Sequence, residues 1–263
     1  MTSKEYIEKI ENFLQKYDIE NATNTCNEAI EKYPNEAKLY YLKALILWNQ
    51  SQVFDLQREE FSELLKQATD LDPHYAEPHK LWAYANELLG YPELALRGYS
   101  RAVEADPTDV EALGKKGELL FRLHDFKDAL ETFNKALSLA KMPSDRLYAF
   151  LGMTKFELDD IQEAIKDFTK SLEINPKAGI SLLGRGRCKK QLGDNKGALE
   201  DFTQAIDLFP RHPKSYLERG DIKVLLNDIP GALQDYKKVL ELAPQNDIAA
   251  QKIRDLEQKN NPM

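Results

Sequence analysis

Small and aromatic residues recur along the chain at helical spacing, in segments separated by short polar turns. In one such segment Ala198 is followed four residues later by Phe202 and three residues after that by Ala205. Positions i, i+4 and i+7 share one face of an α-helix, so this order predicts a helix with a narrow packing face. The same order starts at Ala22, Ala95, Ala129, Ala164, Ala198 and Ala232, with Cys26 in the aromatic place of the first.

A second series of small residues predicts a second helix in each unit. Its members are Ala44, Ala83, Gly117, Gly152, Gly186 and Gly220. Two antiparallel helices approach closely only where a side chain is absent or is a methyl group. The two series therefore predict a helix crossing in every unit, such as that between Gly220 and Ala232.

Prolines and acidic residues divide the helices. Pro34, Pro73, Pro107, Pro176, Pro210 and Pro244 follow apolar runs, and the last three are 34 residues apart. Proline lacks an amide donor and clashes with the preceding turn, so each is expected to end a helix. Asp160, Asp194 and Asp228 are predicted N-caps of second helices, and Thr2 with Glu5 predicts a capping box. Residues 49–54 lengthen one turn, and the absence of a proline at Lys141 allows a bend near 140–145.

These units resemble the tetratricopeptide repeat, whose signature combines an early Trp or Tyr, a Leu-Gly, and later Ala, Phe and Pro. In the stretch DLFPRHPKSYLERGD, Pro210 closes one unit while Tyr216 and Gly220 build the next. The resemblance implies an all-α, right-handed α-solenoid of antiparallel helix pairs, a single domain over residues 1–263. Seven repeats are expected near 3–36, 37–75, 76–109, 110–144, 145–178, 179–212 and 213–246. A capping helix over 247–259 should bury Ile248, Ile253 and Leu256.

Charge and composition exclude several classes of protein. The net charge of −8 argues against nucleic-acid binding, which draws on a surplus of Lys and Arg. The most apolar segment, Leu39 to Trp48, is about half the length needed to span a bilayer and contains Lys43. The start, MTSKEYIEKIENF, lacks the apolar core of a signal peptide, and only two cysteines occur. We therefore expect a cytoplasmic protein without membrane insertion.

No motif predicts catalysis, a cofactor or a metal site. His74, His79, His124 and His212 show no ligand spacing, and neither cysteine has a partner nearby. Gly114-Lys115-Lys116-Gly117 and Gly184-Arg185-Gly186 look loosely like phosphate loops, but both fall inside predicted first helices at the crossing position. The dispersed Asp and Glu residues are interpreted as solvated helix faces. A noncatalytic protein is expected.

The resemblance implies that first helices of successive repeats line the concave side of a superhelix. Carried onto this chain, the groove candidates are Tyr41, Trp48, Lys80, Tyr84, Phe121, Arg146, Phe150, Phe156, Arg187, Lys190 and Lys214. Two interpretations stay open for the aromatic candidates. They grip apolar side chains of a partner while the basic residues hold its acidic groups, or they fill gaps between adjacent repeats.

The function expected is a protein–protein interaction scaffold that binds a protein or peptide segment in this groove. Many co-chaperones of the family clamp a terminal carboxylate with Lys, Asn and Arg; repeats five to seven keep only Lys214, and Glu218 reverses one charge. A chaperone-tail clamp is therefore disfavoured. Two alternatives remain: an assembly or secretion factor that self-associates through the apolar helix at 39–48, and a regulatory module of an enzyme acting in trans.

Overall fold

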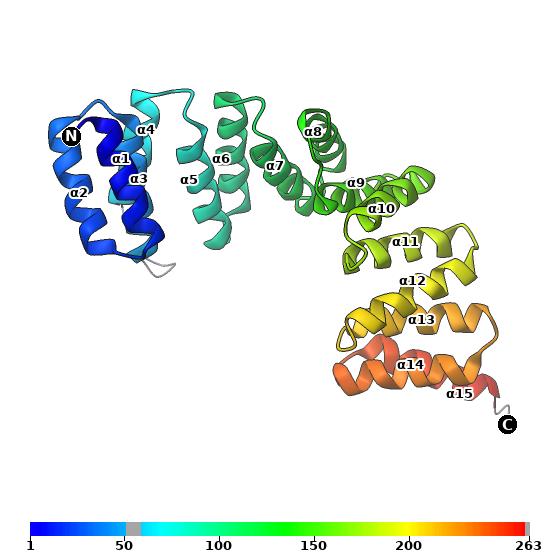
Figure 1. The fold of residues 1–263 in the computed structure, drawn as a ribbon. Coiled ribbons are helices and arrows are strands. Elements are labelled where there is room, and N and C mark those ends of the chain that lie inside the picture. The colour runs from blue at the N-terminus through cyan, green and yellow to red at the C-terminus, as the bar shows by residue number, and fades with distance from the viewer. Residues whose placement is uncertain (51–58, 261–263) are drawn as a thin grey trace. The chain divides into compact units, whose positions relative to one another are not determined.

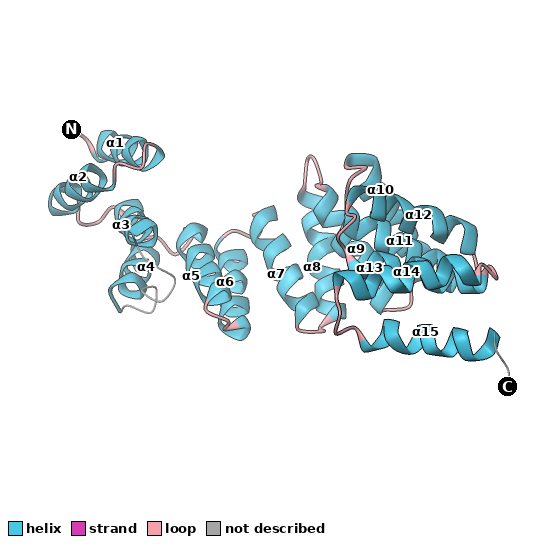
Figure 2. Cartoon of the chain, turned by 90° about the horizontal axis from the view of Figure 1, so that it is seen from below, coloured by secondary structure: helices cyan, strands magenta, loops and turns pink. Residues whose placement is uncertain are grey.

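The computed structural model describes residues 1–50 and 59–260, and within these ranges every regular element is an α-helix. Figure 2 shows helices and connecting loops in the described chain and no strand. The chain divides into two compact units, Met1–Ala140 and Lys141–Met263. The boundary falls at the repeat end that lacks a proline. That the two units form a single domain stays a prediction.

Unit 1 contains four successive helix pairs (Figure 1). They are α1 (Ser3–Gln15) with α2 (Ile19–Lys32), α3 (Ala37–Gln50) with α4 (Glu59–Leu71), α5 (Ala76–Leu88) with α6 (Pro92–Ala105), and α7 (Val110–Arg122) with α8 (Phe126–Leu139). Each helix packs against the next one along the chain. The lengthened turn expected at 49–54 lies mostly outside the described residues.

Unit 2 contains three pairs and a final helix. They are α9 (Asp145–Glu157) with α10 (Ile161–Ile174), α11 (Gly179–Gln191) with α12 (Asn195–Leu208), α13 (Pro213–Leu225) with α14 (Ile229–Leu242), and α15 (Asp247–Asn260). The last helix packs on α14, where Ala249 and Leu256 join the cluster around Tyr236. The expected apolar face was wrong at one position, because Ile248 is 59% exposed and Ala249 is buried in its place.

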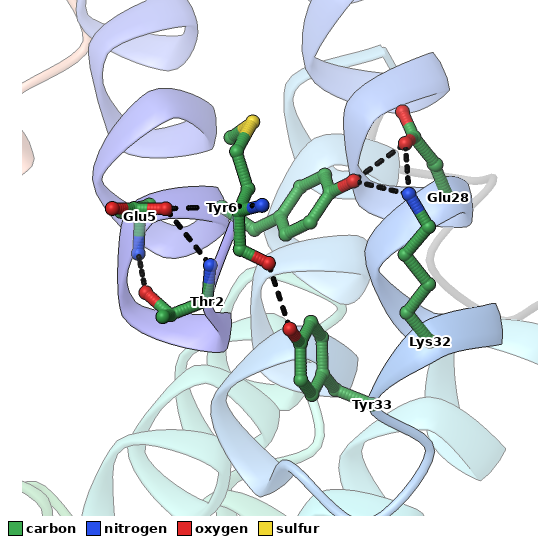
Figure 3. A network of polar contacts seen from close by, with 7 residues as sticks. Thr2, Glu5, Tyr6, Glu28, Lys32 and Tyr33 are labelled. Atoms are coloured by element: carbon green, nitrogen blue, oxygen red, sulfur yellow. Dashed lines mark hydrogen bonds and ion pairs between the residues drawn. The ribbon is translucent and has the colours of Figure 1, made fainter.

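Side chains cap the helices largely where the sequence predicted. The Glu5 N–H donates to Thr2 Oγ1 at 3.3 Å and the Thr2 N–H donates to Glu5 Oε2 at 2.8 Å, which completes the capping box (Figure 3). Asp194 and Asp228 each accept a hydrogen bond from a backbone N–H three residues later. Asp160 occupies the N-cap position of α10, but its side chain makes no capping bond.

A network of polar side chains joins α1 to α2 (Figure 3). The buried Tyr6 donates its hydroxyl proton to Glu28 Oε1 at 2.5 Å, and Lys32 Nζ donates to Tyr6 Oη at 2.7 Å and to Glu28 at 2.6 Å. Tyr33 donates to the Met1 carbonyl at 2.7 Å. The Tyr6 ring is therefore buried without leaving its hydroxyl group unpaired, which would cost free energy.

At four of the predicted crossings the group that faces the glycine is an aromatic ring, and not the small residue with which the sequence analysis paired it. A Cβ added at Gly117 would lie 2.5 Å from Phe133, and one at Gly220 would lie 2.6 Å from Tyr236. The corresponding pairs are Gly152 with Phe168 at 2.9 Å and Gly186 with Phe202 at 2.7 Å. All four rings are buried. Each ring thus occupies the space that any side chain on the facing helix would fill.

Three buried carboxylates on second helices of unit 2 were missed in the sequence. Asp167, Asp201 and Asp235, spaced by 34 residues, are buried, so their interpretation as solvated acids was wrong. Arg185 binds Asp201 through two hydrogen bonds, of 3.0 and 2.7 Å, and Lys189 Nζ lies 2.9 Å from it.

The same arrangement returns one repeat later and is incomplete one repeat earlier. Asp235 is bound by Arg219 at 2.9 and 2.7 Å and by Lys223 at 2.8 Å. Asp167 has Lys155 at 2.6 Å, but Leu151 stands where the other repeats have an arginine. Burial raises the pKa of Asp167 above its ordinary value, although Lys155 acts in the opposite direction.

The crossing contact predicts opposite effects for two glycines of α7. Gly117→Ala should destabilise the protein by about 1–3 kcal/mol, because the new methyl group has to displace the Phe133 ring. Gly114→Ala is the matched control: nothing lies within 4 Å of its added Cβ, so alanine should stabilise the helix by about 0.5–1 kcal/mol. Urea unfolding followed by circular dichroism measures both. Equal stabilisation by the two substitutions would refute the crossing contact.

The buried carboxylates predict a second contrast, within α12. Asp201→Ala should lower the free energy of unfolding by on the order of 3 kcal/mol, because Arg185 and Lys189 lose the charge that compensates their partial burial. Asp207→Ala changes an exposed carboxylate on the same helix and should stay within about 0.5 kcal/mol of the parent protein. The same unfolding experiment compares them, and a similar small loss for both would show that the ion pairs contribute little.

Candidate functional site

A hollow of about 350 Å³ opens on the first helices of unit 1, and we call it the α5 hollow. Its lining residues are Tyr41, Glu77, Lys80, Leu81, Tyr84, Tyr99, Glu111 and Lys115. They come from α3, α5 and α7, with Tyr99 contributed by α6. The hollow therefore brings together three of the eleven groove candidates, from two successive repeats, and its volume suits part of a bound segment.

Lys80 is the groove candidate most tightly held by its own chain. Its Nζ lies 2.9 Å from Glu77, 2.9 Å from Asp109 and 3.1 Å from Glu111, and the side chain is 14% exposed. Burial alone would lower the pKa of Lys80, but the hydrogen bonds to these carboxylates outweigh it and raise the pKa above its ordinary value. The charge of Lys80 is therefore already compensated.

Lys115 contributes the other cation of the α5 hollow. Within residues 1–50 and 59–260 no carboxylate oxygen lies within 4 Å of its Nζ, in contrast to Lys80. Its neighbour Lys116 does not line the hollow. Lys115 lies in the glycine-lysine stretch of the sequence and was not among the eleven groove candidates.

The aromatic candidates of α3 and α5 divide between packing and exposure. Trp48 packs with ring centroids 6.3 Å from Phe61 and 5.4 Å from Tyr84. Tyr41 meets Tyr75 edge to face at 5.4 Å, and burial raises the pKa of Tyr41. Tyr84 keeps 42% of its surface exposed. Trp48 therefore fills the gap between repeats, whereas Tyr84 presents a ring to the hollow.

Phe121 and Phe156 also contact rings or apolar side chains of their own unit. The Phe121 ring lies 5.4 Å from that of Phe126. Phe156 is partly buried against the cluster that holds Phe168 and Ile165. Both side chains therefore contribute to packing, whatever else they contact.

The candidates Arg146 and Phe150 contact each other. Arg146 is exposed, and its guanidinium carbon lies 5.5 Å from the centre of the Phe150 ring, a cation–π distance. Phe150 is partly buried, so the pair presents one charged group above one ring.

The basic candidates of α11 are bound to carboxylates of α13. Arg187 Nε lies 2.7 Å from Glu218, and Lys190 Nζ lies 3.3 Å from both Glu218 and Asp221. Lys214 is exposed. The sequence indicated a basic half of the groove, but two of these cations join neighbouring repeats of the same chain.

A second hollow lies in unit 2 and contains none of the eleven candidates. It has a volume of about 610 Å³ between α11, α12 and α13, and we call it the α11–α13 hollow. Its lining residues are Gly179, Ile180, Leu183, Ala205, Leu208, Phe209, Pro210, Arg211, His212 and Ser215. A comparison of equivalent positions in successive repeats would have indicated it, since Phe209 stands where the preceding repeat has Asn175.

Metal-ligand clusters, thiols and membrane-spanning helices were the other features sought among the described residues. No group of three or more His, Cys, Asp or Glu side chains in them is placed to hold a metal ion. Burial raises the pKa of Cys26 to about 12 and that of Cys188 to about 11, so both thiols are protonated at neutral pH and poorly nucleophilic. None of the helices in the described ranges combines the length and the apolar character needed to cross a bilayer.

Models of one family match the chain. A tetratricopeptide repeat model matches residues 89–145 and 189–247, and a second model of the same description matches residues 145–178. Together these segments cover more than half of the chain.

Curated relatives share part of the sequence. Human tetratricopeptide repeat protein 13 is 35% identical over 94 residues, which are 36% of this chain and 11% of that protein. The Hsp70/Hsp90 co-chaperone CNS1 of Saccharomyces cerevisiae is 35% identical over 80 residues, 29% of this chain and 21% of that protein. A DnaJ homolog subfamily C member 7 homolog of Dictyostelium discoideum is 23% identical over 211 residues, which are 72% of this chain and 38% of that protein. The chain thus spans well under half the length of these relatives.

Solved structures share the fold. YrrB, described as a TPR protein with an unusual peptide-binding site, superposes with a TM-score of 0.62 at 22% identity, over 73% of this chain and 99% of YrrB. The C-terminal part of a TPR repeat-containing protein from Cytophaga hutchinsonii gives a TM-score of 0.67 at 17% identity, over 93% of this chain and 98% of that structure. The expected all-α solenoid of antiparallel helix pairs is thereby confirmed, and the chain belongs to the tetratricopeptide repeat family, as a repeat scaffold for protein interaction.

Proposed function

We propose that the chain binds an extended segment of a partner protein in the concave groove of its first helices, without catalysis, and that the α5 hollow makes the main contact. The observation that carries the proposal is the combination of the half-exposed Tyr84 ring with Lys115, whose Nζ has no carboxylate oxygen of the described residues within 4 Å. Tyrosine is enriched among the residues that dominate binding energy, and a nearby cation adds electrostatic specificity.

The α5 hollow offers different contacts to different parts of a peptide. The rings of Tyr41 and Tyr84 suit an apolar side chain, and Lys115 suits a carboxylate or a carbonyl oxygen. The exposed carboxylate of Glu111 can accept from peptide N–H groups. Because these side chains stand on rigid helices, the receptor loses little conformational entropy on binding.

The other groove candidates are proposed to have two kinds of role. Lys214, which is exposed, and the pair of Arg146 with Phe150 would extend the contact in unit 2. Arg187 and Lys190 would position α13 through Glu218 rather than hold the partner.

The alternative interpretations have less support. Leu39, Leu42 and Ile46 are buried in the core of unit 1, so the apolar helix at 39–48 offers little surface for self-association. A carboxylate clamp like that expected of co-chaperones is disfavoured in repeats five to seven, because Glu218 is paired with Arg187 there. A cytoplasmic location and a regulatory role in trans remain predictions.

Peptide selection followed by matched charge reversal tests the proposed function. Short random peptides are selected on the full chain, and their affinities are measured by fluorescence anisotropy for the parent protein and for Tyr84→Ala, Lys115→Glu and Lys116→Glu. Peptides that occupy the α5 hollow should lose roughly tenfold or more in affinity with the first two variants, equivalent to about 1.4 kcal/mol. Lys116→Glu should leave the affinity unchanged, because Lys116 does not line the hollow.

Circular dichroism shows whether each variant retains its helices. The proposed function would be rejected if every selected peptide bound Tyr84→Ala and Lys115→Glu as tightly as it binds the parent protein.

A further inference from the structure

The α11–α13 hollow exposes large apolar side chains that lie close together. Ile180 is 56% exposed and Phe209 is 46% exposed, and Leu183, Ala205 and Leu208 form the rest of its apolar lining. Clustered exposed apolar residues mark interaction sites more often than scattered ones do. All of these residues belong to unit 2, so the hollow is complete within that unit.

The preceding repeat shows that the fold does not require this apolar surface. In repeat five, Asn175 Nδ2 donates to Asp145 Oδ2 at 2.7 Å, which joins the end of α10 to the start of α9. The residues 34 positions later are Phe209 and Gly179, and a Cβ added at Gly179 would lie 2.6 Å from the Phe209 ring. A polar contact in one repeat is thus replaced in the next by a ring lying against a glycine.

Two more positions change from a polar residue in repeat five to an apolar one in repeat six. Arg146 of repeat five becomes Ile180 in repeat six, and Ser144 becomes Ala178. Ser144 caps α9 by accepting from the Leu147 N–H, whereas Ala178 cannot cap α11 with its side chain. The start of α11 therefore keeps first-turn N–H groups that no side chain of its N-cap residue satisfies.

Charge around the α11–α13 hollow is positive although the chain as a whole is acidic. None of its ten lining residues is acidic, in a chain with 44 acidic and 36 basic residues, and the exposed Arg211 lines it. Lys214 follows at the start of α13. Burial, followed by the charges of Lys214 and Arg187, lowers the pKa of His212, so the positive charge at neutral pH comes from Arg211 and Lys214.

We propose that the α11–α13 hollow binds a partner segment that carries one bulky apolar side chain flanked by carboxylates. The apolar side chain lies against Ile180, Leu183 and Phe209. The carboxylates face Arg211, Lys214 and the first-turn N–H groups of α11, where a helix dipole favours negative charge. This site shares no residue with the α5 hollow, so the two proposals stand or fall separately.

Defined peptides and substitutions taken from repeat five test this site. The probes are fluorescein-labelled acidic peptides of Glu, Asp, Gly and Ser with one central Phe, Leu, Ile, Met or Trp. Their controls carry a central Ala, or Lys in place of every acid. Binding to the full chain is measured by anisotropy for the parent protein, Phe209→Asn and Ile180→Arg. The two substitutions restore the residue types that repeat five carries at the same positions, Asn175 and Arg146.

We expect at least one acidic peptide with a central apolar residue to bind with a Kd below about 100 μM, in the range of weak peptide recognition. Phe209→Asn and Ile180→Arg should each weaken that binding by roughly tenfold, and the Ala and Lys control peptides should bind the parent protein no better than the variants do. Ile248→Arg is the matched control, since Ile248 is equally exposed but does not line the hollow. It should leave the affinity unchanged.

Several results would overturn the proposal. They are the absence of binding by every acidic peptide, equal binding of the Lys peptides, or unchanged binding to Phe209→Asn and Ile180→Arg. Loss of binding in Tyr84→Ala alone would assign the peptides to the α5 hollow instead. Sedimentation velocity at several concentrations tests whether a second copy of the chain fills the hollow instead. Self-association of the parent protein that Ile180→Arg abolishes would show this. Circular dichroism confirms that each variant is folded.

Discussion

In repeats four to seven, the other features depend on the close approach of a helix backbone to an aromatic ring on the next helix. At Gly117, Gly152, Gly186 and Gly220 the ring of the second helix lies where a Cβ would be. A glycine inside a helix costs about 1 kcal/mol relative to alanine, while burying an aromatic ring contributes about 1.5–3 kcal/mol. Burial therefore outweighs the glycine cost, and the spacing of 16 residues between glycine and ring sets how each pair of helices crosses.

Ion pairs within and between repeats determine which charges are left for a partner. Lys80 is surrounded by three carboxylates, and Arg187 and Lys190 are bound to Glu218. Because carboxylates of the chain already compensate these cations, an acidic peptide would gain little binding energy from contact with them. The surfaces that remain are of two kinds. One is the α5 hollow with a half-exposed tyrosine and Lys115, and the other is the apolar α11–α13 hollow beside Arg211.

The sequence predicted the helix pairs, their crossings and most caps, because these depend on residues close together in the chain and repeat at a fixed period. It did not predict that Asp201 is buried, since an acid on a helix looks the same in sequence whether it faces water or an arginine 16 residues earlier. Nor did it predict that Lys80 is compensated by Glu77 and Asp109 of its own repeat and by Glu111 of the next. The sequence did not predict the α11–α13 hollow, because the 34-residue period shows only where residues recur. It does not show that Phe209 and Gly179, which both differ from the equivalent residues of repeat five, contact each other.

Binding is expected to use the side chains that repeat packing leaves exposed, rather than the paired charges or the crossing faces. The most direct measurement is amide chemical-shift mapping of the full chain with a selected peptide. The largest changes should fall on α3, α5 and α7 around Tyr84 and Lys115, or on α11 to α13 around Phe209, while the amides around the buried rings of the second helices should change little. Changes confined to α15 or to the outer faces of second helices would contradict this expectation.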